Sequence, residues 1–231
     1  MQSNKYIFIY SSVMVILVAL ILSSAAMFLR PLQQRNVRIE KMQNILASIN
    51  IQAPRAEAEQ MFSQYIVGSK IVNTIGEELQ GEAFEVDLSS EIRKVPEERQ
   101  LPIFLASVND TVFYIVPVRG KGLWGPIWGY LSLGADLVTI TGANFDHASE
   151  TPGLGAQIRE EAFESQFLGK RIFDEAGNFA PVRVVRGGAQ PGDLHGVDAI
   201  SGGTITSKGV DNMIAEGLGN YELYFRKLKN L

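Results

Sequence analysis

VFYIVPVRGKGLWGPIWGYLSL, residues 112–133, holds two runs of β-branched and aromatic residues on either side of a glycine-rich turn. Runs of this composition, bounded by turn residues, are typical of neighbouring strands. A third run, LVTITG at residues 137–142, follows after a short interval. Residues 112–118, 127–133 and 137–142 therefore predict an antiparallel meander, the sheet on which the rest of the chain packs.

Helical patterns surround this sheet. Apolar residues recur at helical spacing near the C-terminus and predict one amphipathic helix whose last turn is basic. Its apolar positions are Val210, Met213, Ile214, Leu218, Tyr221, Phe225 and Leu228. The other expected elements are helices at 55–66 and 156–167, a strand at 83–88, a surface loop at 89–100 and a hairpin-like pair at 171–173 and 182–185. The fold class is α+β, one antiparallel sheet with packed helices.

The N-terminal end carries an uncharged apolar run of 24 residues, Tyr6–Leu29. At about 1.5 Å per residue it spans roughly 36 Å as a helix, enough to cross a hydrocarbon core of about 30 Å. A cleaved signal peptide is the alternative. However, the run is longer than the usual apolar region of such a peptide, and Arg30-Pro31-Leu32 follows where the cleavage site would stand. We expect a single, uncleaved N-terminal transmembrane helix.

The chain is expected to have three parts. These are a transmembrane anchor in residues 1–30, a helical stalk in 31–66 that continues the anchor after a bend at Pro31, and a soluble domain in 67–231. Only Lys5 is basic before the apolar run, whereas four basic residues follow it by residue 41. The charge rule alone would place the domain in the cytoplasm, although long domains cross membranes largely regardless of charge.

Composition excludes several kinds of chemistry. The chain has no cysteine, so it forms no disulfide, cysteine-ligated zinc site or iron–sulfur cluster. Its two histidines, His147 and His195, disfavour a multi-histidine metal or haem site. A net charge of −4 has the wrong sign for a general nucleic-acid binder. We expect no nucleic-acid partner and no metal site, and we assign no catalytic residue.

Residues 198–207, DAISGGTITS, precede the C-terminal helix. Gly202 and Gly203 allow a ligand to approach the backbone closely, and the N–H groups at the helix start favour a phosphate beside the Thr204 hydroxyl. The spacing is not that of a Walker A loop. The alternative is a glycine-rich turn in which Thr206 or Ser207 only caps the helix.

Two further loops carry aromatic or polar groups. Residues 120–126, GKGLWGP, present Trp124 in a tight turn between two β runs. Residues 147–155, HASETPGLG, carry Glu150 and Thr151 ahead of a Pro-Gly turn. Taken alone, each loop is better interpreted as a connector than as a site. His147 has no nucleophile at a spacing that would suggest a general base.

Taken together and in this order, the loops resemble those of the FMN-binding domain family. The strongest matches are at residues 120–124, 150–155, 157–158, 169–170 and 198–207. Within that family, the Gly-Lys-Gly-Leu-Trp string favours the C subunits of sodium-translocating NADH:quinone reductases over the G subunits of RNF electron-transport complexes.

The resemblance implies FMN joined by a phosphoester to the threonine of a Ser/Thr-Gly-Ala-Thr motif. This motif reads Ser201-Gly202-Gly203-Thr204 here, so Thr204 is the expected attachment residue and Thr206 is the second choice. A glycine replaces the motif's alanine, and Ala148-Ser149 stands where the family more often has one residue. The remaining expected pocket residues are Ser201, Gly202, Gly203 and Asp198 near the phosphate, and Trp124, Glu150, Thr151, Gly153, Leu154 and Gly155 near the ring.

The resemblance also implies a role and a location. The chain would relay electrons from NADH towards ubiquinone within a sodium-translocating complex of the bacterial inner membrane. Its partners would be the other subunits and a Mg²⁺-dependent flavin transferase that installs FMN. The FMN domain would lie on the periplasmic side, against the charge rule. The alternatives are an RNF-type G subunit coupled to ferredoxin and NAD, and a flavin-free, membrane-tethered binding module.

Overall fold

The computed structural model describes residues 4–229 and contains two compact units, Met1–Lys41 and Met42–Leu231. The first residues of the expected anchor, 1–3, and the last of the expected domain, 230–231, lie outside the described residues. The division of the chain at residues 30 and 66 stays a prediction.

Helix α1 (Asn4–Ala47) has 44 residues and contains the apolar run. It remains helical across Pro31, although proline removes one backbone hydrogen bond and usually bends or breaks a helix. An 18-residue window of α1 has a mean hydropathy of 2.6, and none of that window is buried. By length and composition, α1 is therefore a candidate membrane span.

The end of α1, within the second unit, is fixed by packing and by a left-handed residue. Ile45 and Leu46 are fully buried. Asn50 has a φ of 60°, and the N–H of Ile51 returns to the carbonyl of Leu46 at 3.1 Å, as in a Schellman-type helix end. The Ser132 hydroxyl donates to the carbonyl of Ser48 at 2.6 Å, which joins this end to the sheet.

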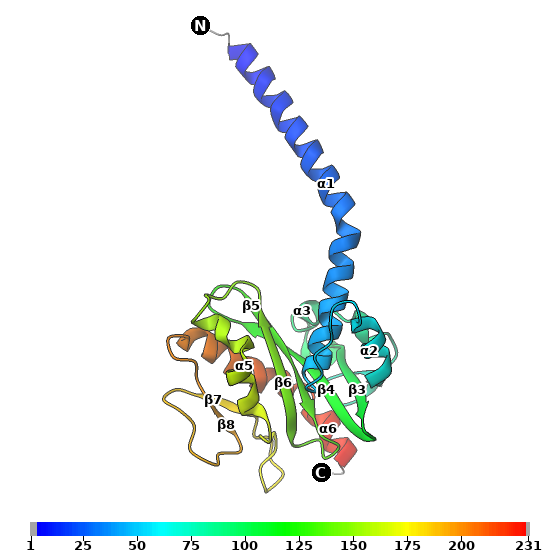
Figure 1. Cartoon of the computed structure of the whole chain (residues 1–231), viewed down its shortest axis with the longest axis vertical. Coiled ribbons are helices and arrows are strands. Elements are labelled where there is room, and N and C mark those ends of the chain that lie inside the picture. The colour runs from blue at the N-terminus through cyan, green and yellow to red at the C-terminus, as the bar shows by residue number, and fades with distance from the viewer. Residues whose placement is uncertain (1–3, 230–231) are drawn as a thin grey trace. The chain divides into compact units, whose positions relative to one another are not determined.

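The sheet has six antiparallel strands in the order β2-β1-β3-β4-β5-β6 (Figure 1). Their bounds are β1 Ile66–Val72, β2 Glu78–Leu79, β3 Leu101–Val108, β4 Thr111–Lys121, β5 Pro126–Leu133 and β6 Ile140–His147. The α+β fold class and the meander are confirmed, because β4, β5 and β6 pair in sequence order. Strands β1 and β3 were not expected; β1 occupies charged, half-exposed sequence that lacks the apolar density of the meander.

The third run of the meander begins later than expected. Residues 137–139 form a turn in which the Asp136 carboxylate accepts the N–H groups of Val138 and Thr139, both at 3.0 Å. Leu137 has a φ of 56°, a conformation incompatible with a strand. Strand β6 therefore starts at Ile140 and runs on to His147, directly into the loop that carries Glu150.

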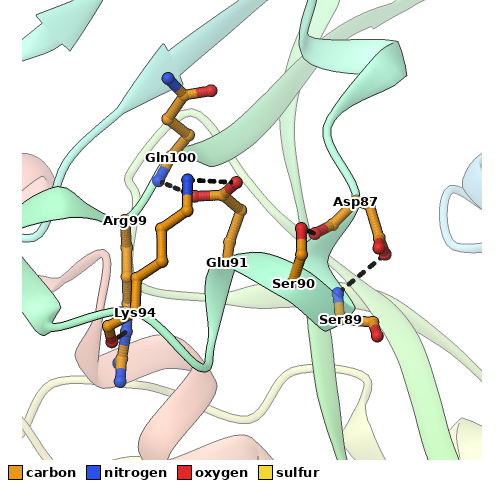
Figure 2. Close-up of polar contacts among 7 residues, drawn as sticks. All are labelled: Asp87, Ser89, Ser90, Glu91, Lys94, Arg99 and Gln100. Carbon is orange, nitrogen blue, oxygen red and sulfur yellow. Dashed lines mark hydrogen bonds and ion pairs between the residues drawn. The ribbon is translucent and has the colours of Figure 1, made fainter.

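The expected strand at 83–88 is wrong. These residues form a 3₁₀ turn, η1 (Ala83–Glu85), and the start of helix α3 (Leu88–Glu91). Figure 2 shows the cause: the Asp87 carboxylate accepts the N–H of Ser89 at 2.9 Å, and the Ser90 hydroxyl donates to the Asp87 carbonyl at 2.8 Å. An aspartate that caps a helix in this way ends extended structure.

The segment 89–100 is more ordered than a plain surface loop. It contains the end of α3 and a 3₁₀ turn, η2 (Pro96–Glu98). Buried Glu91 accepts the Gln100 N–H at 2.9 Å and the Lys94 ammonium at 2.8 Å, which closes the segment on itself (Figure 2). The Arg99 guanidinium also donates to Asn220 Oδ1 at 2.9 Å, so this segment is tied to the C-terminal helices.

Three expected helical elements differ in detail. The helix at 55–66 is α2 (Ala58–Tyr65), which follows a turn from Pro54 to Glu57. The helix at 156–167 is replaced by η3 (Gly155–Arg159), α4 (Glu161–Glu164) and η4 (Ser165–Phe167). Glu160 breaks it with an extended ψ of 141°. The side chains expected inside, Ile158, Phe163 and Phe167, are nevertheless buried.

The expected hairpin between 171–173 and 182–185 is wrong. Phe173 instead bridges to Phe179, because the Asp174 carboxylate accepts the Asn178 N–H at 2.8 Å and closes a shorter turn. Strand β7 (Arg183–Val185) pairs in parallel with β8 (Gly196–Asp198), a segment expected only as loop. This small sheet leads directly into the glycine-rich residues before the C-terminal helix.

The C-terminal helix is divided into α5 (Thr204–Gly219) and α6 (Glu222–Lys229). The break lies at Asn220-Tyr221, where the buried Tyr221 hydroxyl donates to the Pro102 carbonyl at 3.1 Å. Helix α5 packs on β4. The expected apolar face is buried apart from Leu228, and α6 ends in three basic residues as expected. The core thus lies between α5 and one face of the sheet, and the first residue of α5 is Thr204.

Candidate functional site

The three loops identified from sequence occupy defined positions in the fold. The first is the β4–β5 turn, closed by a hydrogen bond from the Gly122 N–H to the Gly125 carbonyl at 2.8 Å. The second follows β6 and runs to the start of η3. The third connects β8 to α5. Side-chain contacts show that these loops meet.

Glu150 joins the three loops. Its side chain is buried, with a relative exposure of 5%. Oε1 accepts the N–H of Trp124 at 2.9 Å, and Oε2 accepts the hydroxyl of Thr206 at 2.5 Å. The backbone N–H of Glu150 donates to Nδ1 of His147 at 3.2 Å. One carboxylate therefore connects the β4–β5 turn, the loop after β6 and the first turn of α5.

Two glycines make room for this carboxylate. A Cβ atom on Gly122 would stand 2.5 Å from Oε1 of Glu150. A Cβ atom on Gly155 would stand 2.5 Å from Oε2 and 2.5 Å from the Thr206 Oγ1. Real Cβ contacts are not this short, so both positions require glycine unless the carboxylate moves. The buried junction thus explains why Gly122 and Gly155 are glycines.

Helix α5 begins without a side-chain cap. Gly203 occupies the N-cap position, and the first backbone bond of the helix runs from the Ser207 N–H to the Gly203 carbonyl at 2.8 Å. The N–H groups of residues 204–206 precede this bond and have no partner within the helix. The helix start is therefore a favourable position for an anion.

The two candidate threonines differ in environment. Thr204 is exposed, and within residues 4–229 no hydrogen bond occupies its hydroxyl. Thr206 is 1% exposed, and its hydroxyl is bonded to Glu150. Only the Thr204 hydroxyl is therefore accessible in this conformation.

The loop before Thr204 is held from both sides. The Ser207 hydroxyl oxygen accepts the Ile200 N–H at 3.0 Å, and Gly202 adopts a φ of 73°. The carboxylate of Asp198 accepts the Ala189 N–H at 2.7 Å, and its own N–H donates to Gln166 Oε1 at 2.7 Å. Asp198 thus orients neighbouring loops, whereas the Ser201 side chain is exposed.

Exposed apolar side chains lie on these loops. Trp124 is 65% exposed, Leu154 is 42% exposed, and Ile205, next to Thr204, is 58% exposed. Leu154 reaches the glycine loop, since a Cβ atom on Gly202 would be 2.7 Å from its Cδ2. Single exposed apolar residues are ordinary, but several on adjoining loops are typical of a surface that a ligand or partner covers.

Two further expected residues support the loop after β6 through their backbone. The Thr151 carbonyl accepts the N–H groups of Leu154 and Ala156, both at 3.1 Å, while its side chain is exposed. Gly153 has a φ of 74° and faces open space, so that a Cβ atom placed on it would meet no other atom within 4 Å. The fold therefore brings together the residues that we expect near the flavin ring. Trp124 and Leu154 present exposed side chains, whereas the side chain of Glu150 is buried.

Asp211 anchors α5 and was not identified from sequence. Its buried carboxylate accepts Arg183 at 2.7 and 2.9 Å, Lys208 at 2.7 Å and the Val184 N–H at 3.0 Å. Burial opposes its ionisation, but the hydrogen bonds from Arg183 and Lys208 outweigh burial and hold the pKa of Asp211 well below its usual range. Lys208 lies three residues before Asp211, so helical spacing could have indicated this ion pair. Arg183 lies 28 residues away, so no local pattern could have indicated its ion pair with Asp211.

A cavity beside α5 lies at the other end of that helix. It has a volume of about 110 Å³ and is lined by residues from α3, β4 and the end of α5, among them Arg99, Pro117 and Tyr221. None of the three loops lines it. The candidate site is therefore distinct from this cavity, and its exposed apolar side chains include Trp124, Leu154 and Ile205.

Neither histidine is arranged as a catalytic base. Nδ1 of His147 accepts the Glu150 N–H, and its Nε2 is buried with no hydrogen-bond partner within residues 4–229. Nδ1 of His195 lies 2.7 Å from the Ala180 carbonyl, in a loop. Both observations agree with a structural role for the two rings.

Comparison with known proteins identifies the family. The model of the FMN-binding domain family matches residues 122–219. This range contains Gly122–Trp124 of the β4–β5 turn, the whole loop after β6 and the whole of α5. The C subunit of the Na(+)-translocating NADH-quinone reductase of Vibrio vulnificus (strain YJ016) is 31% identical over 220 residues, which cover 87% of this chain and 86% of the relative. The chain belongs to the family of these C subunits.

Solved structures of the same family share the fold. The C subunit of the Na(+)-translocating NADH-quinone reductase from Parabacteroides distasonis ATCC 8503 is 43% identical, has a TM-score of 0.79, and matches 85% of this chain and 96% of that one. NqrC from Shewanella oneidensis is 28% identical with a TM-score of 0.70, and the match covers 84% and 98% of the two chains. The resemblance drawn from the three loops is thus confirmed for the family, while the roles of individual site residues stay predictions.

The residues present fit FMN. Unpartnered N–H groups at the start of α5 suit a phosphate, and the exposed Trp124 and Leu154 side chains suit an aromatic ring. Among the described residues of the site, no cluster of acidic side chains would repel an anion: the carboxylate of Glu150 is buried and already hydrogen-bonded.

Proposed function

We propose that this chain is the FMN-carrying electron-transfer subunit of a membrane-bound Na⁺-translocating NADH:quinone reductase, with FMN attached through its phosphate to the hydroxyl of Thr204. The observation that carries the residue assignment is the exposed Thr204 hydroxyl at an uncapped helix start, inside the segment that matches the FMN-binding domain family. The names of the relatives support the complex.

Thr204 is preferred to Thr206 on accessibility. Phosphoester formation requires that the attacking hydroxyl reach the phosphorus atom, and the Thr206 hydroxyl is buried against Glu150. Modification of Thr206 would break that bond and leave a buried carboxylate oxygen without its donor, which carries a free-energy cost. Modification of Thr204 requires neither change.

The chain's own groups would bind and orient the cofactor. The N–H groups of residues 204–206 would hold the negative charge that a phosphodiester retains, because they point out of the helix start. Trp124 and Leu154 would cover part of the ring system and exclude water from it. When bound, FMN supplies reversible electron acceptance and donation.

The same proposal includes partners and location. With no cysteine, this chain cannot ligate an iron–sulfur cluster, so any cluster on the electron route would belong to another subunit. We propose that α1 holds the chain in the bacterial inner membrane and that the domain lies on the periplasmic side. A flavin transferase would take FMN from FAD: the Thr204 oxygen would bond to the FMN phosphorus as the bond to AMP breaks, and AMP would leave while the hydroxyl gives up its proton. Electrons would pass from NADH towards quinone.

Mass mapping tests the attachment. The full-length chain, produced together with a flavin transferase, should carry the added FMN mass on the peptide that contains Thr204. Thr204→Ala should remove covalent flavin fluorescence without unfolding the domain, because the side chain is exposed. Ser165→Ala, which removes an exposed hydroxyl outside the three loops, is the matched control and should keep the label.

Two results would contradict this assignment. A wild-type chain that carries no FMN on any peptide would remove the covalent-flavin proposal. A label that survives Thr204→Ala and maps to Thr206 would replace the residue. Co-purification with RNF subunits, instead of quinone-reductase subunits, would contradict the complex but not the attachment.

A further inference from the structure

We infer that Glu150 is the positioning residue of the flavin site: its buried carboxylate locks the β4–β5 turn to the first turn of α5 and thereby holds Thr204 outwards for modification. This inference rests on the proposed function. It assigns Glu150 a different task from the ring contact expected from the resemblance.

The burial and bonding of the carboxylate support this task. The Glu150 side chain is only 5% exposed, and each of its oxygens already has a donor, the Trp124 N–H and the Thr206 hydroxyl. With so little of the side chain exposed, a ring would have little access to the carboxylate. The carboxylate is hydrogen-bonded to residues that are 26 and 56 positions away in the sequence, so it connects the three loops.

Helix geometry links this junction to Thr204. Successive residues of an α-helix are rotated by about 100°, so Thr204 and Thr206 point in directions about 200° apart. Holding the Thr206 hydroxyl inwards on Glu150 therefore directs Thr204 towards solvent, in agreement with the observed exposures. The same carboxylate holds the N–H of Trp124, the residue proposed to cover the ring.

The junction has no cation to replace a missing donor. Within residues 4–229, no lysine or arginine forms an ion pair with Glu150, so its two acceptor oxygens depend on one N–H and one hydroxyl. Removing either donor leaves a buried acceptor unsatisfied, which costs more than the bond itself contributes. The loops are therefore expected to separate when one partner is altered.

The first experiment measures the junction without flavin. The full-length chain is purified in detergent from a host that lacks the flavin transferase, and hydrogen–deuterium exchange is followed at the Trp124 amide. Glu150→Leu should accelerate exchange of this amide about tenfold or more, because an aliphatic side chain of similar size accepts neither the Trp124 N–H nor the Thr206 hydroxyl. Glu161→Leu, at an exposed glutamate, is the matched control and should leave exchange unchanged.

The second experiment measures Thr204 modification. Thr206→Val keeps the side-chain shape but removes the hydroxyl, whereas Thr206→Ser retains it. Thr206→Val should lower the initial rate of FMN incorporation about tenfold, and Thr206→Ser should restore it. Peptide mapping locates the remaining label on Thr204. This pair keeps the inference testable if Glu150→Leu does not fold.

The outcomes separate the inference from the function on which it rests. Unchanged Trp124 exchange in Glu150→Leu, or wild-type labelling in Thr206→Val, overturns the positioning role even if Thr204 carries FMN. Fast exchange in Glu150→Leu together with a wild-type chain that never carries FMN retains the junction and overturns the proposed function. Equal loss of labelling in Thr206→Ser and Thr206→Val also overturns the inference, because the hydroxyl would then be irrelevant.

Discussion

Glu164 is expected to make the domain less stable as pH rises. This residue of α4 covers the edge strand β6: its Oε1 accepts the Phe145 N–H at 2.6 Å and lies 3.4 Å from Nδ2 of Asn144. Burial raises the pKa of Glu164 from 4.5 to about 7, and the negative charges of Asp146 and Glu160 raise it further. The hydrogen bond from the Phe145 N–H and the positive charge of Arg159 lower this pKa but do not cancel the effect of burial.

The direction of the effect follows from proton binding. Between pH 4.5 and about 7, the folded chain keeps a proton on Glu164 that the unfolded chain has lost. The free energy of unfolding therefore falls as pH rises through this window. The full shift corresponds to about 3 kcal/mol. Because Glu164 is only partly buried, solvent screening reduces the expected contribution to about 1–2 kcal/mol.

Glu164→Gln isolates this contribution. The amide carbonyl can still accept the Phe145 N–H but does not titrate, so the variant should be about 1–2 kcal/mol more stable than the wild type at pH 8 and nearly equal to it at pH 5. Urea unfolding of both full-length chains at pH 5, 6, 7 and 8, in the same detergent, measures the difference. Glu161→Gln is the exposed control. A difference that is constant across these pH values would refute the reasoning.

Three other changes test the fold and the site. Asp211→Asn should lower the free energy of unfolding by about 2–3 kcal/mol at pH 7, since Arg183 and Lys208 lose their buried partner but can turn to solvent. This difference should shrink as pH falls below the usual pKa of an aspartate, because the lowered pKa of Asp211 contributes its full stability only above that usual pKa. Ser132→Ala should cost about 1–2 kcal/mol in urea unfolding, because the Ser48 carbonyl loses a buried donor. Trp124→Ala should change the stability of the flavin-free chain by less than about 0.5 kcal/mol, since its side chain is exposed, but should increase quenching of bound-flavin fluorescence by iodide.

The predictable parts of the fold are those in which local sequence and packing agree. The meander and the apolar face of α5 have dense, regular apolar patterns, and both were recognised. The segment at 83–88 was not, because one capping side chain, Asp87, decides between extended and helical structure. At the break in the C-terminal helix, Asn220 accepts a hydrogen bond from Arg99, 121 residues away, and Tyr221 donates one to Pro102, 119 residues away. Nothing in the local pattern indicates these bonds.

The candidate site divides in the same way. The three loops could be found from their glycine-rich sequences and from their order along the chain, and the structure brings them together. Their junction could not be found, because the bond between Glu150 and Thr206 joins residues 56 positions apart. Sequence patterns indicate which residues are unusual, whereas the pairing of buried polar atoms is decided only by the packed chain.

The exposed position of Thr204 has a consequence for how a cofactor would stay in place. The exposed Trp124 and Leu154 side chains alone offer a small ligand little contact area, so a flavin held only by them would leave readily. The proposed bond to the Thr204 hydroxyl would replace affinity with a high effective concentration, since the ring could rebind but could not diffuse away. The ring could then stay accessible to a neighbouring electron carrier without being lost.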